Sequence, residues 1–531
     1  MNLSRIILMI AVILMPGLAW AEEIAERLRS TDENVQIQTL GELSQDGEKG
    51  KPYVDTMVQL MSMQWRGKRL SRWCFHALTK ITNDPDKYIE TYMNAAGWLH
   101  YNVVPVGESG PIGGPQPDRR GPALPDGLQE ASRDAWKTSL ARVAPLLKSD
   151  KLRAVQECLS QMDAPPELLV PELAAILDDQ AAKPEARAAA AEIIGKYGPW
   201  KDSTDILARG IQSADASVRA ASAAALGHLG TPYNPYGGGS GNPHHPRAEK
   251  AVELLLQALK DPDAAVRRSA AQGLRDMCAE GRSSAAPLSE LLKNDPEKAV
   301  RSSAAYALGS IGSPDGLAAL AAALTDSDNY VRSVAASSIG SLTGQLCRRD
   351  PKSIAALAKA VVPQLLAALD GDESTACAAA QSISAFRSSA AEAIPKLHSI
   401  ITTSKSKSLA GRAVFALGWM GAAAKDEIPD IIKASERNSD LWGGALALYR
   451  IGVGSPVAEE FLLKLLANED EVTRLWAVQA MGVIGSDRAE ILDALKRVSE
   501  KDADEEVKRF ASEAIVTIRA KAGAGGHKAD F

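Results

Sequence analysis

Residues 300–312 read VRSSAAYALGSIG, and this stretch decides the fold of the chain. Counted from Val300, apolar or small residues fall at positions 4, 7, 8 and 11, which form one face of a helix with 3.6 residues per turn. Glu297, three residues before the valine, suits the start of such a helix because its charge complements the helix dipole. Glycine readily adopts the left-handed conformation that ends a helix, so we expect Gly309 and Gly312 both to lie where the helix stops.

The same pattern recurs with a spacing of about 31–35 residues. Clear copies begin at Val218 and Val331, a weaker copy begins at Val266, and residues 35–43 begin a degenerate first one. Further copies in the same register begin near Leu70, Lys151, Ala186, Thr375, Leu409, Asp440, Thr473 and Val507. In many copies the residue three places before the start is an aspartate, which we expect to cap the helix: Asp215, Asp263, Asp328, Asp470 and Asp504.

A second amphipathic helix is predicted between successive copies, for example over residues 249–260, 314–324 and 456–466. Each repeat is therefore a helical hairpin. One hairpin cannot bury its apolar face alone, whereas a stack of hairpins buries a continuous core. The sequence thus predicts an all-α fold, an α-solenoid in which about a dozen hairpins form a superhelix.

The repeat resembles the HEAT repeat, in particular the short HEAT-like type also found in phycobilin lyases. The resemblance rests on DPDAAVRRSA at residues 261–270 and on the stretch at 300–312, and it covers residues 136–520 and, more weakly, 30–81. It implies a structural role for the recurring arginines, which would form ladders with aspartates of successive hairpins: Arg187, Arg219, Arg267, Arg301, Arg332 and Arg474. The alternative, a basic stripe that binds phosphate, is disfavoured because acidic residues recur at matching spacing.

Residues 1–21 have the three parts of a secretory signal peptide: Arg5, an apolar run over 6–15, and small residues at Ala19 and Ala21. The alternative, an uncleaved anchor, is disfavoured because ten apolar residues are short for a bilayer that needs about 20. We therefore expect a bacterial protein exported to the periplasm or outside the cell, with a mature chain starting at Glu22 and no further membrane span.

The rest of the chain divides by composition. Residues 22–81 are predicted to form an N-terminal helical region with degenerate HEAT-like repeats, followed by a Pro/Gly-rich insertion at 82–135. The repeat solenoid spans 136–520, with a second Pro/Gly-rich loop insertion at 231–247 and a milder lengthening around 345–352. Residues 521–531 are predicted to be a flexible tail. Trp65, Trp73, Phe75 and His76 are expected to form a capping core near the N-terminal end.

Composition and motifs argue against several classes of function. A formal net charge of −6 disfavours nucleic-acid binding, which depends on basic surface. Phosphate loops, zinc-binding spacings and nucleophile elbows are all absent from the sequence, so we expect no catalytic residue, no cofactor and no metal site. The pair His244-His245 fits a solvated loop better than a metal site. The five cysteines do not form a disulfide framework; buried thiols are favoured, and two bridges with one free thiol remain an alternative.

Large residues gather at outward positions of three consecutive C-terminal repeats. They are the predicted partner-binding residues Arg412, Phe415, Trp419, Trp442, Arg450 and Trp476. Aromatic residues and arginine dominate binding hot spots, so these side chains could form one continuous patch. The alternative is that they fill gaps between hairpins beside the glycines Gly411, Gly443 and Gly444.

These features predict an exported, non-catalytic scaffold that binds another protein through the curved surface of a solenoid. One alternative is a ligand-binding solenoid that uses the aromatic patch to hold a glycan or a cofactor. The resemblance to phycobilin lyases implies a third, an enzyme that attaches or isomerises bilins. That family works in the cytoplasm of light-harvesting organisms, which disagrees with a secretory signal.

Overall fold

The computed structural model describes residues 23–30, 33–45, 47–62, 74, 77–78, 81–82, 140–141, 143–149, 152–161, 166–197, 202–229 and 246–523. Every regular element in these residues is a helix. None of the described helices is long and apolar enough to cross a membrane. The chain divides into two compact units, Met1–Gly241 and Asn242–Phe531, and each is described by itself.

The first unit contains short helices near the N-terminus and two hairpins near its end. Its elements are α2 (Glu33–Gln45), α3 (Gly47–Gly50), η1 (Lys51–Tyr53), α4 (Val54–Ser62), η2 (Ala144–Lys148), α8 (Leu152–Gln161), α9 (Pro166–Asp178), α10 (Pro184–Lys196), α11 (Ser203–Ile211) and α12 (Ala216–Leu229). Helix α10 packs against α9 and α12, and α11 packs against α12, so the two hairpins are stacked on each other.

The second unit is a regular row of hairpins. Its α-helices are α13 (Pro246–Ala258), α14 (Ala264–Asp276), α15 (Ala285–Asn294), α16 (Lys298–Ile311), α17 (Leu317–Ala322), α18 (Asn329–Arg349), α19 (Ile354–Ala368), α20 (Glu373–Ile383), α21 (Ile394–Thr403), α22 (Lys407–Trp419), α23 (Ile428–Asn438), α24 (Leu441–Ile451), α25 (Pro456–Leu465), α26 (Glu471–Ile484), α27 (Ala489–Lys501) and α28 (Glu505–Gly523). Its 3-10 helices are η3 (Cys278–Ser284), η4 (Pro314–Gly316), η5 (Ala323–Thr325), η6 (Pro351–Ser353), η7 (Ser384–Ala393) and η8 (Gly421–Glu427).

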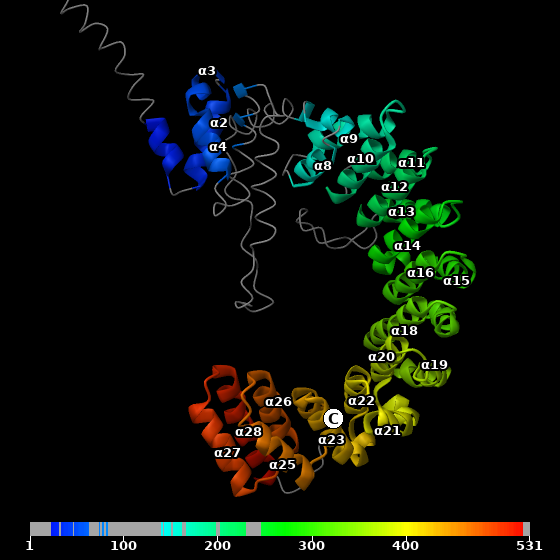
Figure 1. The fold of residues 1–531 in the computed structure, drawn as a ribbon, viewed down its shortest axis with the longest axis vertical. Coiled ribbons are helices and arrows are strands. Elements are labelled where there is room, and N and C mark those ends of the chain that lie inside the picture. Colours follow the sequence, from blue (N-terminus) through cyan, green and yellow to red (C-terminus); the bar gives the residue numbers. More distant parts are fainter. Residues whose placement is uncertain are drawn as a thin grey trace, which may run out of the picture. The chain divides into compact units, whose positions relative to one another are not determined.

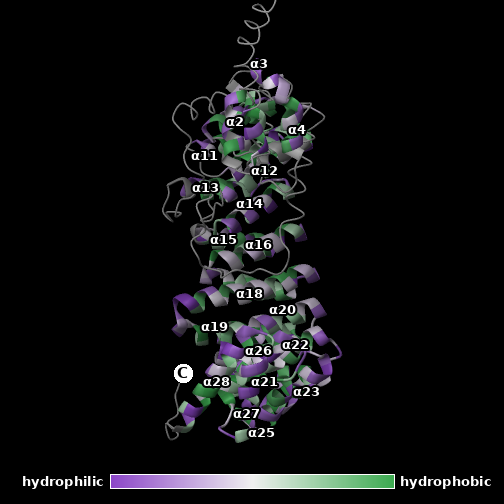
Figure 2. Ribbon diagram, turned by 90° about the vertical axis from the view of Figure 1, so that its left-hand side faces the viewer, coloured by the Kyte–Doolittle hydropathy of each residue, from purple (hydrophilic) through white to green (hydrophobic). Residues whose placement is uncertain are grey.

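The helices of the second unit form two layers (Figure 1). Each even-numbered helix from α14 to α28 packs on the next even-numbered helix, and we call this row the even-numbered layer. The odd-numbered helices form the other layer, each packed against its hairpin partner. Figure 2 shows hydrophobic and hydrophilic residues alternating along the helices, as expected where one face of each helix is buried. The predicted all-α solenoid of stacked hairpins is therefore confirmed.

The helices begin where the aspartates predict. Asp263 accepts a hydrogen bond from the backbone N–H of Ala265, and Asp470 accepts one from Thr473. Asp215, Asp328 and Asp504 likewise accept N–H groups of the first turns that follow them. Glu297 makes no such bond, because its longer side chain does not reach back to the backbone as that of aspartate does. The predicted capping positions are confirmed.

The two glycines of the repeat have different roles. Gly312 adopts a φ of +67° and ends α16, and Gly421 (φ +62°) and Gly452 (φ +67°) stand at the same repeat position. Gly309, by contrast, lies inside α16, and a Cβ atom there would stand only 2.8 Å from the Cβ of Ser338 on α18. The expectation that both glycines end the helix is wrong for the first, whose missing side chain lets neighbouring helices approach closely.

Four of the six recurring arginines form the predicted ladder. Arg301 donates to the backbone oxygens of Asp295 and Pro296, at 3.0 and 3.2 Å, and makes two 2.8 Å bonds to the carboxylate of Asp326. The same arrangement pairs three other arginines with an aspartate of the next hairpin: Arg267 with Asp295, Arg332 with Asp372, and Arg474 with Asp502. Arg187 and Arg219 bond to backbone oxygens of the chain just before them. All six arginines thus stabilise the turns between helices, and the four with an aspartate partner also join successive hairpins.

Some of the remaining predictions are corrected by the structure, and others concern residues that it does not describe. The extra residues after Thr343 are helical, because α18 continues to Arg349, and α28 continues to Gly523. The signal peptide, most of the 82–135 insertion, residues 231–245 of the predicted 231–247 loop and residues 524–531 lie outside the described residues, whereas residues 246 and 247 begin α13. So do Trp65, Trp73, Phe75, His76, His244 and His245. Of the cysteines, Cys74 is a fully buried free thiol, whose pKa burial raises, and Cys347 and Cys377 are half-buried free thiols.

Candidate functional site

The six predicted partner-binding residues lie on three consecutive helices of the even-numbered layer. Helix α22 carries Arg412, Phe415 and Trp419, α24 carries Trp442 and Arg450, and α26 carries Trp476. Trp442 is exposed, with 45 % of its surface accessible to solvent, Arg412 is exposed as well, and the other four are half-buried. The structure places all six in the same layer of the same unit.

Three of these side chains contact one another across α22 and α24. Phe415 and Trp419 are one helical turn apart, and their ring centroids lie 6.3 Å apart in an edge-to-face arrangement. The guanidinium carbon of Arg450 lies 3.9 Å from the centroid of Trp419 and 4.8 Å from that of Phe415. Arg450 therefore stacks on the rings of the neighbouring hairpin as a cation–π contact.

A fourth residue, Arg387, joins this group from the preceding hairpin. Its guanidinium carbon lies 5.5 Å from the centroid of Trp419. Arg387 stands twelve residues after Thr375, the repeat position that glycine occupies at Gly312, and it adopts a left-handed φ of 52° with ψ −138°. Sequence reasoning missed Arg387, although an arginine at a glycine position was the available signal. We call Arg387, Phe415, Trp419 and Arg450 the Trp419 cluster.

The arginines of this region lack an acidic partner in the part of the chain that the structure describes. Arg387, Arg412 and Arg450 form no ion pair with any carboxylate of the described residues, whereas the ladder arginines do. The Nη1 atom of Arg450 is buried and has no hydrogen-bond partner within the described part of the chain. Burial lowers the pKa of Arg450, against a smaller opposing effect of Tyr449. The cluster thus brings together positive charges that no carboxylate of the described residues pairs with.

The remaining predicted residues lie apart from the cluster. Trp476 packs edge-to-face on Tyr449, at 5.9 Å between ring centroids, and Tyr449 is the residue before Arg450. Arg412 donates a hydrogen bond to the side chain of Gln381. Trp442 stands at the start of α24, two helical turns before Tyr449. The structure therefore joins Phe415, Trp419 and Arg450 directly and leaves Arg412, Trp442 and Trp476 around them.

The glycines invoked by the gap-filling alternative face polar groups. A Cβ atom on Gly411 or Gly443 would meet the carboxylate of Asp440, and one on Gly444 would meet the hydroxyl of Ser435. The distances from the added Cβ atom to these polar atoms would be 3.3 Å at Gly411 and 2.5 Å at both Gly443 and Gly444. A neighbouring side chain therefore already fills the space beside each glycine.

A second cluster, which the sequence did not indicate, lies in the odd-numbered layer. Nδ1 of His398 on α21 is 2.5 Å from Oε2 of Glu427 and 3.8 Å from Oδ2 of Asp430 on α23. One nitrogen and two carboxylates this close could hold a divalent metal ion. Lys433 already pairs with Asp430, at 3.1 Å, and the positive end of the α23 dipole lies beside the same carboxylate. The hydrogen bond between His398 and Glu427 joins two hairpins, and this structural role explains why the three side chains lie close together.

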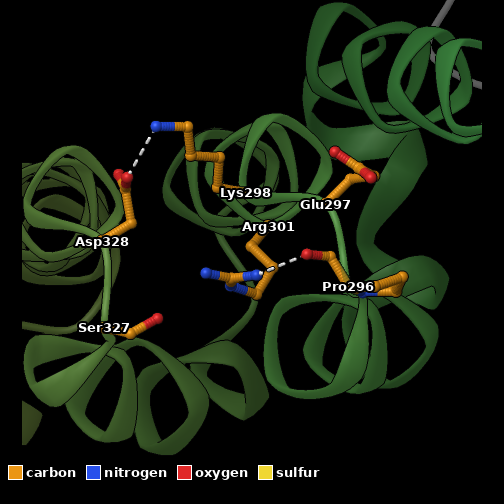
Figure 3. Close-up of a pocket in the computed structure, with 6 residues that line it drawn as sticks. All are labelled: Pro296, Glu297, Lys298, Arg301, Ser327 and Asp328. Atoms are coloured by element: carbon orange, nitrogen blue, oxygen red, sulfur yellow. Dashed lines mark hydrogen bonds and ion pairs between the residues drawn. The ribbon is translucent and has the colours of Figure 1, made fainter.

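A shallow pocket of about 380 Å³ lies between the turns that precede α16 and α18 (Figure 3). Its lining is Pro296, Glu297, Lys298, Arg301, Ser327 and Asp328. The hydrogen bond from Lys298 to Asp328, at 3.0 Å, lowers the pKa of that carboxyl, and Arg301 bonds to the carboxylate of Asp326. Because three of its charges are paired within the protein, this pocket belongs to the ladder between hairpins.

Comparison with protein-family models matches the repeats. Residues 170–234 and 285–362 match a model described as HEAT repeats, and residues 251–280 match a model of the HEAT repeat. Residues 218–261 match the PBS lyase HEAT-like repeat. A search of curated proteins found no match. The resemblance inferred from the repeat pattern is thus confirmed.

Solved structures of karyopherins share the fold. A Kap121p mutant aligns with a TM-score of 0.57 at 14 % identity, over 96 % of this chain and 58 % of that one. An importin β crystallised in polyethylene glycol aligns with a TM-score of 0.52 at 13 % identity, over 98 % and 83 %. Kap95p, a yeast importin β solved with RanGDP, aligns with a TM-score of 0.51 at 14 % identity, over 97 % of this chain and 75 % of that one. At these identities the likeness is one of fold.

Proposed function

Because the chain is a HEAT-repeat α-solenoid, we propose that it is an exported, non-catalytic scaffold that binds another protein. The partner sits on the even-numbered layer at α22, α24 and α26. Each hairpin of such a stack contacts its neighbours and presents a few side chains, so the surface for one extended partner is built from several hairpins.

The observation that carries this proposal is the Trp419 cluster and the residues around it. Tryptophan, tyrosine and arginine are the residues that most often dominate the binding energy of protein interfaces. Here they stand on three successive helices, with Trp442 45 % and Tyr449 37 % exposed. The arginines among them have no carboxylate partner in the described residues, so they are available to a partner.

A structural neighbour gives further support. Binding of Kap95p induces the switch loops of RanGDP to adopt the GTP-bound conformation. The fold shared with Kap95p is thus one that can hold a protein partner, although the low identity transfers no binding residue.

Ligand binding is the second candidate, and the exposed ring of Trp442 favours it. A flat indole accessible over nearly half of its surface can stack on a sugar ring or a planar cofactor. A lyase-like activity has less support, since the match to the PBS lyase HEAT-like repeat spans residues 218–261, away from these helices in sequence.

Export rests on residues 1–21 and has its own test. Mass spectrometry of the protein isolated from its native cell should show a mature chain that begins at Glu22, in the envelope or medium. A protein that keeps its first 21 residues and stays in the cytosol would contradict export.

Affinity capture from native cell extracts tests the binding surface. The purified protein, its Trp442→Ala variant and its Tyr330→Ala variant serve as matched baits. Tyr330 is a control because it is a large aromatic residue, 57 % exposed, in the even-numbered layer on α18. We expect a partner that wild type and Tyr330→Ala retain and that Trp442→Ala loses, with similar melting temperatures for all three.

Two outcomes would contradict the proposal. Equal capture by all three baits would place the partner elsewhere, and a large fall in the melting temperature of Trp442→Ala would make this ring part of the core. Quenching of tryptophan fluorescence by small glycans or a tetrapyrrole, without any captured protein, would favour the ligand-binding alternative.

A further inference from the structure

We infer that the Trp419 cluster is a carboxylate-binding site that takes an aspartate or glutamate side chain from an acidic segment of the partner protein. The inference rests on the proposed function, which it deepens by naming the chemistry of the partner. Arg450 and Arg387 supply the charge, and Trp419 and Phe415 supply the apolar surface beside it.

The hydrogen-bonding set of Arg450 is incomplete within the described residues. Nη1 of Arg450 is buried and has no acceptor among the described residues, although buried polar groups in native proteins are nearly always hydrogen-bonded. The rings of Trp419 and Phe415 lie against the guanidinium but offer it no acceptor oxygen, and Arg450 as a whole is only half-buried. A carboxylate is the acceptor that best matches the planar fork of a guanidinium, through two parallel hydrogen bonds.

Arg450 differs in its hydrogen-bond partners from the ladder arginines of the same unit. Arg267, Arg301 and Arg474 are each held by two oxygens of an aspartate and two backbone oxygens. Arg450 has neither kind of partner in the part of the chain that the structure describes. Within the described residues, the protein thus gives each of these structural arginines four acceptor oxygens and gives none to the arginine that stacks on aromatic residues of the preceding hairpin.

The backbone of Arg387 has a positive φ, which is unusual for a residue other than glycine. Twelve residues after the repeat start, three other copies place a glycine with positive φ, Gly312, Gly421 and Gly452, whereas Arg387 holds a strained φ of 52°. This strained backbone directs a second guanidinium to Trp419. Taken together, the two distances to the Trp419 centroid place the guanidinium carbons of Arg387 and Arg450 within about 9 Å of each other. A single acidic segment can span that distance.

Charge favours a protein over a nucleic acid as the source of the anion. The chain carries 66 acidic and 60 basic residues, so it lacks the excess of basic surface that follows a phosphate backbone. The arginines of this region form a compact group among rings, which suits one or two carboxylates of a peptide.

Fluorescence anisotropy of labelled peptides tests the inference with the purified protein. The probe is a twelve-residue peptide that alternates glutamate with leucine and phenylalanine, and its control replaces every glutamate by glutamine. A single-stranded oligonucleotide of similar charge is the third probe. We expect the acidic peptide to bind at least tenfold more tightly than either of the others, with an affinity that falls as salt rises.

Two variants and two matched controls locate the site. Arg450→Gln should weaken binding of the acidic peptide about tenfold or more, because a charged, two-bond contact is lost. Arg268→Gln removes an exposed positive charge from α14 in the same layer and should leave the affinity unchanged. Melting temperatures verify that both proteins are folded.

Arg387→Gly separates binding from folding. Glycine relaxes the left-handed backbone, so this variant should melt at a higher temperature than wild type while it binds the peptide at least fivefold less tightly. Cys278→Gly is its control, because Cys278 occupies the same repeat position with a φ of 50°. It should melt higher as well and bind like wild type.

Three results would overturn the inference. They are equal binding of the acidic and glutamine peptides, tighter binding of the oligonucleotide, and unchanged binding by both Arg450→Gln and Arg387→Gly. If the captured partner depends on Trp442 and not on Arg450, the scaffold function stands and the carboxylate site fails. If the acidic peptide binds as described while no protein is captured, the carboxylate site stands and the scaffold function fails.

Discussion

Replacing Asp502 by asparagine removes the acidic member of one ladder pair. Arg474 makes bonds of 2.8 and 2.9 Å to this carboxylate, and the two side chains are only 13 % and 6 % exposed. The hydrogen bonds from Arg474 lower the pKa of Asp502, so the carboxylate is charged at neutral pH. A hydrogen bond to a charged group contributes about 1.5–3 kcal/mol, and breaking a buried pair from one side costs about 3–5 kcal/mol. We expect Asp502→Asn to destabilise the α26–α28 region by about 3 kcal/mol.

The control is an exposed pair in the same hairpin. Arg509 and Glu506 of α28 lie 3.3 Å apart and are 57 % and 61 % exposed, so Glu506→Gln should change stability by no more than about 0.5 kcal/mol. Urea unfolding followed by circular dichroism gives the stability, and hydrogen exchange of α27 and α28 shows whether opening is local. Equal effects of the two substitutions would refute the view that the buried ladder holds the hairpins together.

Two further predictions concern helix packing and pH. Gly309→Ala should destabilise the protein by about 1–3 kcal/mol, because a Cβ atom would stand 2.9 Å from the Cα of Ser338, whereas Gly344→Ala, with open space around it inside α18, should stabilise by up to about 1 kcal/mol. Urea unfolding measures both, and a shared sign would contradict the assigned role of Gly309. Burial acts to raise the pKa of Asp372, but hydrogen bonds from Arg332 and Thr375 outweigh it and bring the pKa to about 2. A lowered carboxyl pKa stabilises the fold above the unfolded value near 3.9 and loses this contribution as pH falls through about 2, so acid titration of Asp372→Asn should show a shallower loss of stability than wild type over that range.

Much of the fold could be predicted because the same local sequence pattern recurs in many copies. An aspartate before the helix, an apolar face at 3.6-residue spacing and an arginine next to the valine each have one physical role, and the hairpin stack satisfies all of them. Gly309 shows where this reasoning failed. A glycine near the end of a helical pattern fits both a helix stop and a close approach, and only the position of Ser338 on the next hairpin separates the two.

The candidate site was predicted in part for the same reason. Helical spacing placed Phe415 and Trp419 on one face, but it could not show that Arg450 reaches across to them from the next hairpin. Arg387 was missed because it lies in a turn, at a repeat position where glycine is expected. The helical spacing therefore could not show that its guanidinium approaches Trp419. Likewise, the contact of His398 with Glu427 joins residues 29 apart in the sequence with no motif between them.

Site-specific photo-crosslinking in native cell extracts tests the central claim, that a protein partner sits on α22, α24 and α26. A benzoylphenylalanine replaces Trp442 in one protein and Tyr330 in another, both exposed aromatic positions of the even-numbered layer. We predict one discrete protein adduct from position 442, its loss when Arg450→Gln is added, and no such adduct from position 330. An adduct from position 330 alone would contradict this placement of the partner, whereas an adduct from position 442 that persists with Arg450→Gln would contradict the carboxylate site and leave the placement standing.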